Sequence, residues 1–185
     1  AGAARRPGWS RKAAHALALV DEADPCLVSI SDSRALGEAA AIRATRGFQS
    51  GEHSWQVDVE ACSDWSYVGI VAEPWLAVSS PVGRSLHSWG VASSGAAYAC
   101  REEVGMLREF RAGSRLVFSV LTNGSASVSV TVDGEEFPEV FKELPAPIFP
   151  AVSNCRSGAR YRLSFDCEGE AAPHRGSGSA APESP

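Results

Sequence analysis

Hydrophobic and polar residues alternate with a period of two over most of the chain after residue 26. Residues 56–60 (QVDVE) alternate without interruption, and the short runs at 67–71, 116–121 and 127–132 are rich in β-branched side chains. Successive side chains of a strand point to opposite faces, so this period predicts β-strands with one buried face. Further strands are expected at 27–30, 96–100, 148–152 and 161–166.

Two glycine-containing pairs separate or close consecutive predicted strands. Asn123 and Gly124 stand between two runs, and Asp133 and Gly134 close the next one. Both central residues of a type I′ hairpin turn need positive φ, which Asn, Asp and Gly adopt readily. Residues 115–137 are therefore predicted to form an antiparallel meander. Many short strands without intervening helices predict an all-β fold, an antiparallel β-sandwich.

The two ends of the chain differ from its middle. Residues 9–20 (WSRKAAHALALV) combine helix-forming residues with a modest apolar repeat, so we expect a short N-terminal helix there. Residues 1–8 are small and basic, and residues 168–185 lack any large apolar side chain. Segments of this composition cannot offset their ordering entropy, which predicts a flexible N-terminus and a disordered tail around one domain at 9–167.

Composition limits the classes of partner. The chain has 185 residues, of which 44% are hydrophobic, enough for one core. A net charge of -5, with no run of five Lys or Arg, argues against nucleic acid as a partner. No apolar stretch approaches the roughly 20 residues that a membrane helix needs, and no leader-like segment is present. We therefore expect a soluble, cytoplasmic protein without membrane insertion.

The chain shows no pattern typical of catalysis or metal binding. None of the common hydrolase, nucleotide-binding or zinc-protease motifs occurs, and no two histidines have metal-ligand spacing. The cysteines are odd in number and contain no C-x-x-C pair, which favours free thiols in a reducing compartment. We predict no enzyme activity, no metal and no cofactor. The cysteines are Cys26, Cys62, Cys100, Cys155 and Cys167.

Four tryptophans fall in or beside predicted strands: Trp55, Trp65, Trp75 and Trp89. A tryptophan combines a large apolar area with one donor, so each can pack in the core. Aromatic residues near loop ends are also common anchors of binding sites. Both interpretations remain open for each of the four residues.

The segment FQSGEHSWQVDV at 48–59 resembles the F-x-S-G-x-H-Y-W-E-V-x-V motif of SPRY domains, which occur in tripartite-motif ubiquitin ligases, butyrophilins and SOCS-box adaptors. DWSYVGIV at 64–71 resembles the W-x-x-G-V strand, with one extra residue before Gly69. SWGVASSGAAY at 88–98 resembles the following hairpin, and EVFKELPAPIFPAV at 139–152 resembles the L-x-x-P-L-x-P-x-V ending. The resemblance extends from about Cys26 to Cys167, with the SPRY core at about 48–167.

Two departures from the family pattern concern the first half and one turn. The usual PRY opening is replaced by VDEADPCL at 20–27, although LVSISDSRAL at 27–36 is similar to the first PRY strand. Ser114 stands where the family has an acidic residue after glycine, in GSRLVF at 113–118. The resemblance implies a PRY-SPRY-like domain with a bent, concanavalin-like jelly-roll sandwich, whose motif residues are structural and whose partner site lies in loops.

The contact positions of the family, transferred to this sequence, give a candidate surface for a protein or peptide ligand. The resemblance implies a non-catalytic interaction module, the substrate- or partner-recognition domain of a TRIM-type ubiquitin ligase or of a cytoskeletal adaptor. Any ligase activity or oligomerisation would reside in regions outside this chain. The candidate residues are Arg34, Asp64, Val91, Ser93, Ser94, Tyr98, Arg101, Ser153 and Asn154.

A carbohydrate-binding, lectin-like sandwich is the alternative to a protein-binding module, since such proteins share this architecture. Their sites commonly use Asp and Asn with calcium, and the acidic residues here do not cluster at calcium spacing. A hydrolase would need a nucleophile and a base, for which the sequence offers no pair. We expect the interaction module.

Overall fold

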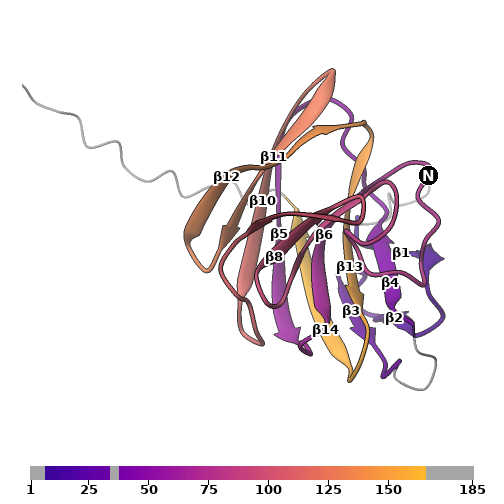
Figure 1. Ribbon diagram of the computed structural model, residues 1–185. Helices are drawn as coiled ribbons and strands as arrows, with labels where there is room; N and C mark the ends of the chain where they lie inside the picture. The colour runs from indigo at the N-terminus through magenta and orange to yellow at the C-terminus, as the bar shows by residue number, and fades with distance from the viewer. Residues whose placement is uncertain (1–6, 34–37, 166–185) are drawn as a thin grey trace, which may run out of the picture.

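Two seven-stranded antiparallel sheets make up the computed structural model, which describes residues 7–33 and 38–165; no helix occurs within those ranges. The first sheet runs β1 (Trp9–Ala14), β4 (Ala40–Ala44), β13 (Ile148–Asn154), β6 (Ser66–Ala72), β7 (Ser88–Ala92), β8 (Ala96–Ala99), β9 (Glu102–Met106). The second runs β12 (Glu135–Leu144), β11 (Ser125–Val132), β10 (Arg115–Asn123), β5 (Gly51–Ala61), β14 (Ala159–Phe165), β3 (Leu27–Ile30), β2 (Ala18–Val20). The sheets lie face to face as a bent sandwich (Figure 1).

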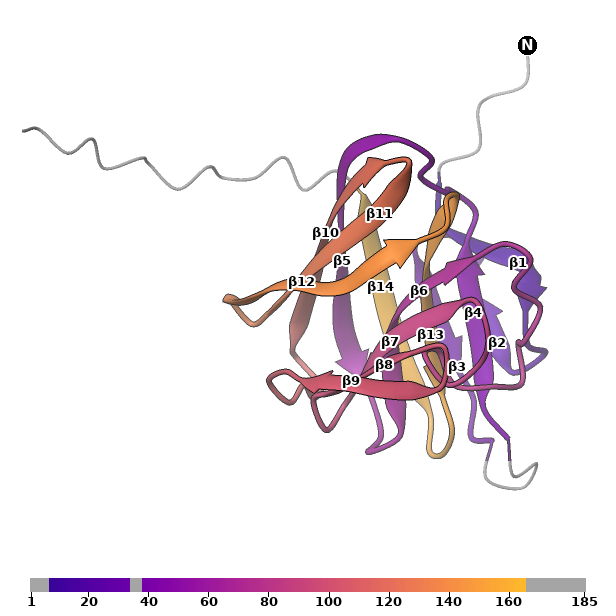
Figure 2. The same ribbon diagram turned by 45° about the horizontal axis from the view of Figure 1, so that its top comes forward.

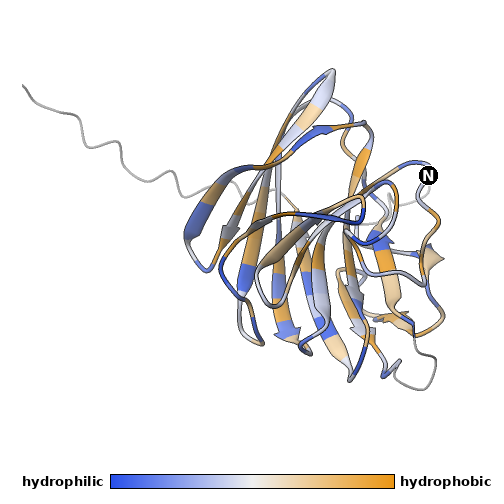
Figure 3. Cartoon of the chain, viewed as in Figure 1, coloured by the Kyte–Doolittle hydropathy of each residue, from blue (hydrophilic) through white to orange (hydrophobic). Residues whose placement is uncertain are grey.

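Alternation along the strands of the second sheet places every other side chain in the core between the sheets. In β10 and β11 the buried residues are spaced by two. The positions between them are all Ser or Thr in β11, whereas in β10 they include the apolar Val117 and Leu121 as well as polar residues (Figure 3). Strands β6 and β13 are buried along their whole length, because a second apolar layer covers the outer face of the first sheet. The loop 73–87 supplies Trp75 and Val82 to that layer.

A column of aromatic rings fills the core at the segment 48–59. The Trp55 indole is fully buried and stacks between Phe48 and Phe118, with ring centroids 5.2 Å and 5.5 Å away. Offset stacking of this kind adds to the free energy gained by burying the aromatic area. For Trp55, Trp75 and Trp89 the core-packing interpretation is confirmed, since each is at least nine-tenths buried.

The N-terminal segment is not the short helix that its composition predicts. Residues 9–20 contain β1 and β2, which pair with β4 and β3. Trp9 is buried, and its indole N–H donates a 2.8 Å hydrogen bond to the Cys26 carbonyl. Tertiary pairing and burial thus override the high helix propensity of Arg, Lys and Ala.

The N-terminal boundary differs slightly from the prediction. Gly8, placed with the flexible N-terminus by its composition, donates its N–H to Thr45 Oγ1 and accepts the Thr45 N–H. It therefore belongs to the folded domain. Residues 1–6 and the predicted tail 168–185 lie outside the described residues.

The two predicted turns have different geometries. Asp133 and Gly134 both have positive φ and connect the Val132 to Glu135 pair, as a type I′ turn requires. At the other turn only Gly124 has positive φ, and Thr122 pairs with Ala126, so the type I′ prediction is wrong there. The meander of β10, β11 and β12 is nevertheless present.

Several loops gather at one end of the sandwich (Figure 2). They connect β5 to β6, β7 to β8, β9 to β10 and β13 to β14. Strand register brings them together, since Asn154 pairs with Ser66, and Tyr67 pairs with Ala92. Loops held by a rigid sandwich are common places for binding residues.

Candidate functional site

Three of the predicted site residues meet at this loop end. Asp64 comes from the β5–β6 loop, and Ser93 and Ser94 come from the β7–β8 loop. All three line one cavity of about 440 Å³, together with residues of the β9–β10 loop. Asp64 and Ser94 are exposed, whereas Ser93 is 9% exposed. The other lining residues are Cys62, Ser63, Glu109, Phe110, Arg111 and Ala112.

Asn154 lies beneath the loops and not on the surface that the resemblance implies. It is fully buried, and its side-chain oxygen accepts hydrogen bonds from the hydroxyls of Ser63 (2.7 Å) and Ser66 (2.9 Å). Its amide nitrogen donates to the carbonyl of Ser157 at 2.5 Å. Asn154 therefore ties the β5–β6 loop to the β13–β14 loop, and its side chain offers nothing to a partner.

Ser153 and Val91 are also buried, which corrects their assignment to a contact surface. The Ser153 hydroxyl accepts the N–H of Val82 at 2.9 Å and so fixes the loop over the outer face of the first sheet. Val91 packs in the core between the sheets. The sequence predicts a strand that ends at residue 152 and places Val91 in a hairpin, whereas Ser153 belongs to β13 and Val91 to β7.

The remaining candidates do not join the cavity. Tyr98 is half-buried, with the Arg84 guanidinium 4.5 Å from its ring centroid. Arg101 is exposed in the turn after β8, at the end of that strand away from Ser94. Arg34 lies outside the described residues.

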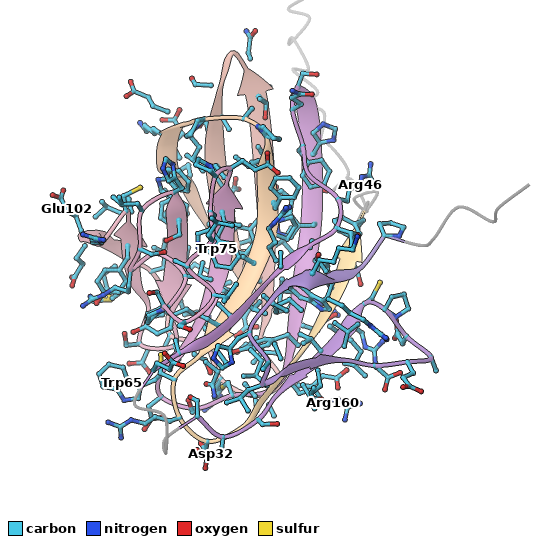
Figure 4. All side chains as sticks on the ribbon, turned by 90° about the vertical axis from the view of Figure 1, so that its right-hand side faces the viewer. Asp32, Arg46, Trp65, Trp75, Glu102 and Arg160 are labelled. Carbon is cyan, nitrogen blue, oxygen red and sulfur yellow. The ribbon has the colours of Figure 1, made fainter. Side chains whose placement is uncertain are left out.

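Trp65 is the exposed aromatic residue of this loop end. It is 45% exposed and lies at the periphery of the domain in Figure 4. The Arg156 guanidinium lies 5.0 Å from its ring centroid. The Trp65 carbonyl accepts the N–H of Cys155, which fixes its loop against the β13–β14 loop. Trp65 resembles a motif tryptophan in sequence. In the sequence, only the extra residue between Trp65 and Gly69 distinguishes this exposed tryptophan from the motif tryptophan.

Glu109 and Arg111 complete the surface, and no sequence pattern indicates their role. Their loop is fixed by Ser114, whose hydroxyl accepts the Arg111 N–H and donates to Asp133. Serine at the family's acidic position thus forms a turn of its own. We call the following set the loop-end surface: Asp64, Trp65, Ser93, Ser94, Glu109, Arg111 and Arg156.

The thiols near this surface are kept neutral. Burial raises the pKa of Cys62, and the nearby Asp64 carboxylate raises it further, against a hydrogen bond from the Ala112 backbone. Burial also raises the pKa of Cys155 from 9.0 to about 11, although Arg156 opposes the shift. A neutral thiol is a poor nucleophile and a poor metal ligand. The surface therefore offers hydrogen bonds, charge and an aromatic ring.

No group of three His, Cys, Asp or Glu side chains that could hold a metal ion occurs within residues 7–33 and 38–165. Over the same ranges no helix is long and apolar enough to span a bilayer. The pocket beside β1 and β2, at Gly8 to Lys12 and Val20 to Glu22, is lined by side chains of both charges.

Solved structures share this arrangement of strands. The SPRY domain of human HERC1 superimposes with a TM-score of 0.72 at 18% identity, over 86% of this chain and 99% of that one. This chain has the SPRY fold. A human SPRY domain gives a TM-score of 0.66 at 20% identity, over 80% of this chain and 94% of that one. The TRIM65 PSpry domain gives a TM-score of 0.61 at 18% identity, over 86% of this chain and 92% of that one. No protein-family model and no curated protein matches the sequence.

The comparison confirms the fold that the motifs predict, including the strand of Trp55 and the all-β sandwich. Because the SPRY fold is shared at this low identity, it positions the loops without specifying what they bind. The loop-end surface has to be judged from its own residues.

Proposed function

We propose that this domain is a non-catalytic protein-recognition module that binds a protein or peptide through the loop-end surface. The observation that carries the proposal is Trp65, an exposed indole held by fixed loops beside an open cavity. Tryptophan and arginine are the residues most enriched among binding hot spots, and Arg156 lies against this indole.

The rigidity of the loops supports the same proposal. Asn154 holds the β5–β6 loop, and Ser114 holds the β9–β10 loop, through buried or half-buried hydrogen bonds. Loops that are already ordered lose little entropy on binding, so more of the contact energy appears as affinity. The charges are mixed, with Asp64 and Glu109 against Arg111 and Arg156. Mixed charge suits a specific polar partner.

The finer proposal is that the module recognises substrates or partners for a TRIM-type ubiquitin ligase or a cytoskeletal adaptor in the cytoplasm. The sequence motifs support it, as do the four described cysteines, which are all free thiols, as expected in a reducing compartment. The carbohydrate-binding alternative gains no specific observation from the structure.

Quantitative affinity purification from cytosol tests the proposal with Trp65→Ala, Ser94→Arg and a control, Leu121→Ala. Leu121 is 53% exposed on β10, at the end of that strand away from the loops. A true partner is recovered by the wild type and the control and lost with both loop variants. Truncating a hot-spot tryptophan costs about 2 kcal/mol or more, roughly thirtyfold in affinity. Equal recovery of every protein by all four forms would contradict the proposal.

A further inference from the structure

Strand β9 (Glu102–Met106) forms one outer edge of the first sheet and pairs with β8 alone among the described strands. It runs along the front of the sandwich in Figure 2. All five of its residues are exposed. An edge strand presents unpaired N–H and C=O groups to any extended chain that approaches it.

The hydrogen bonds show which groups of β9 remain available. Leu107 N–H donates to the Gly95 carbonyl, and Met106 pairs in register with Ala96. Since bonded and unbonded pairs alternate in an antiparallel ladder, Met106 directs its own N–H and C=O away from β8. The register shift between Ala97 and Tyr98 leaves Val104 opposite no residue of β8.

The other three sheet edges carry features that oppose strand addition. Strand β2 has only three residues, and β1 has a register shift together with exposed Arg11 and Lys12. Strand β12 contains Pro138 and Lys142, two register shifts and positive φ at Glu139 and Glu143. Short length, proline, lysine and bulges are the usual means of blocking an edge. Strand β9 has one register shift of its own, at Val104, but it is longer than β2 and contains neither proline nor lysine.

The side chains of β9 specify what kind of strand could pair with it. Val104 and Met106 are 50% and 63% exposed, so they offer apolar contact at one end. Glu102 and Glu103 are exposed at the other end, and Figure 4 shows Glu102 directed away from the domain. Among the described residues no ion pair engages these two carboxylates. Opposite charges across neighbouring strands stabilise pairing, and like charges oppose it.

We propose that β9 is a strand-addition site for an extended peptide that carries two apolar residues followed by a basic pair. In antiparallel register the apolar residues lie opposite Met106 and Val104, and the basic pair lies opposite Glu103 and Glu102. A second copy of this chain fits less well, because β9 contains no basic residue that could pair with Glu102 and Glu103. This site is separate from the loop-end surface and does not rest on the function proposed there.

Fluorescence anisotropy tests the proposal with a fluorescein-labelled peptide, Gly-Thr-Val-Thr-Val-Lys-Lys-amide, and a control peptide with Glu in place of both Lys. Met106→Pro removes an outward N–H without removing a bond to β8. Wild type and Leu121→Ala bind the Lys peptide equally. Met106→Pro and Glu103→Lys weaken binding by about tenfold or more, a change of about 1.4 kcal/mol. The Glu peptide binds weakly to all forms.

Several outcomes would overturn the proposal. These are absence of Lys-peptide binding to the wild type, undiminished binding to Met106→Pro, or equal binding of the Glu peptide. Far-UV circular dichroism establishes that Met106→Pro is folded, and Glu103→Lys provides an independent variant if it is not. Sedimentation equilibrium tests whether a second copy of the chain occupies the β9 edge instead. A wild-type dimer that Met106→Pro abolishes would assign the edge to a second copy and reject the peptide.

Discussion

Trp55 and Trp65 lie in neighbouring parts of the chain and have opposite surroundings. Trp55 is fully buried in β5 between Phe48 and Phe118, whereas Trp65 is 45% exposed in the next loop beside Arg156. Both belong to segments that resemble SPRY motifs. The contrast shows that motif residues at Trp55 maintain the sandwich, while the loop around Trp65 is available for recognition.

The largest expected effect is the loss of stability when the buried Trp55 is truncated. Trp55→Ala removes an indole that stacks on two rings and leaves a cavity in the core. Substitutions of this kind cost about 3–5 kcal/mol. Urea unfolding followed by circular dichroism measures the loss, with Trp65→Ala as the matched control. A loss below about 1 kcal/mol would show that the aromatic column is not a main source of stability.

Asn154→Ala tests the connection between the scaffold and the loops. It leaves the Ser63 and Ser66 hydroxyls without their acceptor and the Ser157 carbonyl without its donor, all near the buried end of β13. Unsatisfied groups of this kind cost about 1–3 kcal/mol. Hydrogen exchange should accelerate at the β5–β6 loop and not at the β10–β11 turn. Uniform acceleration over both would contradict a local role for Asn154.

Cys155 provides a pH-dependent test at the boundary between the two regions. Burial raises its pKa from 9.0 to about 11, so the folded state retains the thiol proton at a pH where the unfolded state has lost it. The stabilising contribution is complete below about pH 9 and is lost as the pH rises toward 11. Urea unfolding at a series of pH values between about 8 and 11 should show a smaller decline in the free energy of unfolding for Cys155→Ala than for the wild type. Equal declines would contradict the raised pKa of Cys155 in the folded state.

Sequence reasoning succeeds where local pattern and tertiary environment agree. Strand β11 and residues 56–60 of β5 alternate cleanly, and the Trp55 segment carries enough motif residues to predict the fold. Strand β9 was missed because Glu102 to Met106 has no alternation and is fully exposed, so pairing with β8 alone defines it. Strand β1 was expected as a helix, because its propensity gives no sign of the β4 partner that determines its conformation.

The loop-end surface was predicted only in part, for a related reason. The contact positions that the resemblance implies include Asp64, Ser93 and Ser94, and one cavity brings these three together. Asn154 looked like a polar loop residue, but its hydrogen bonds are to other loops and not to solvent. Glu109 and Arg111 approach from a distant segment. That approach depends on strand order, which no local pattern specifies.

The smallest expected change in stability belongs to Trp65→Ala, and this variant tests the central claim most directly. Because the indole is 45% exposed and lies outside the two hydrophobic core clusters, its removal should change the free energy of unfolding by no more than about 0.5 kcal/mol. Calorimetric titration with a partner recovered by the wild type should show at least about thirtyfold weaker binding. Unchanged affinity in a normally folded variant would contradict the assignment of recognition to the loop-end surface.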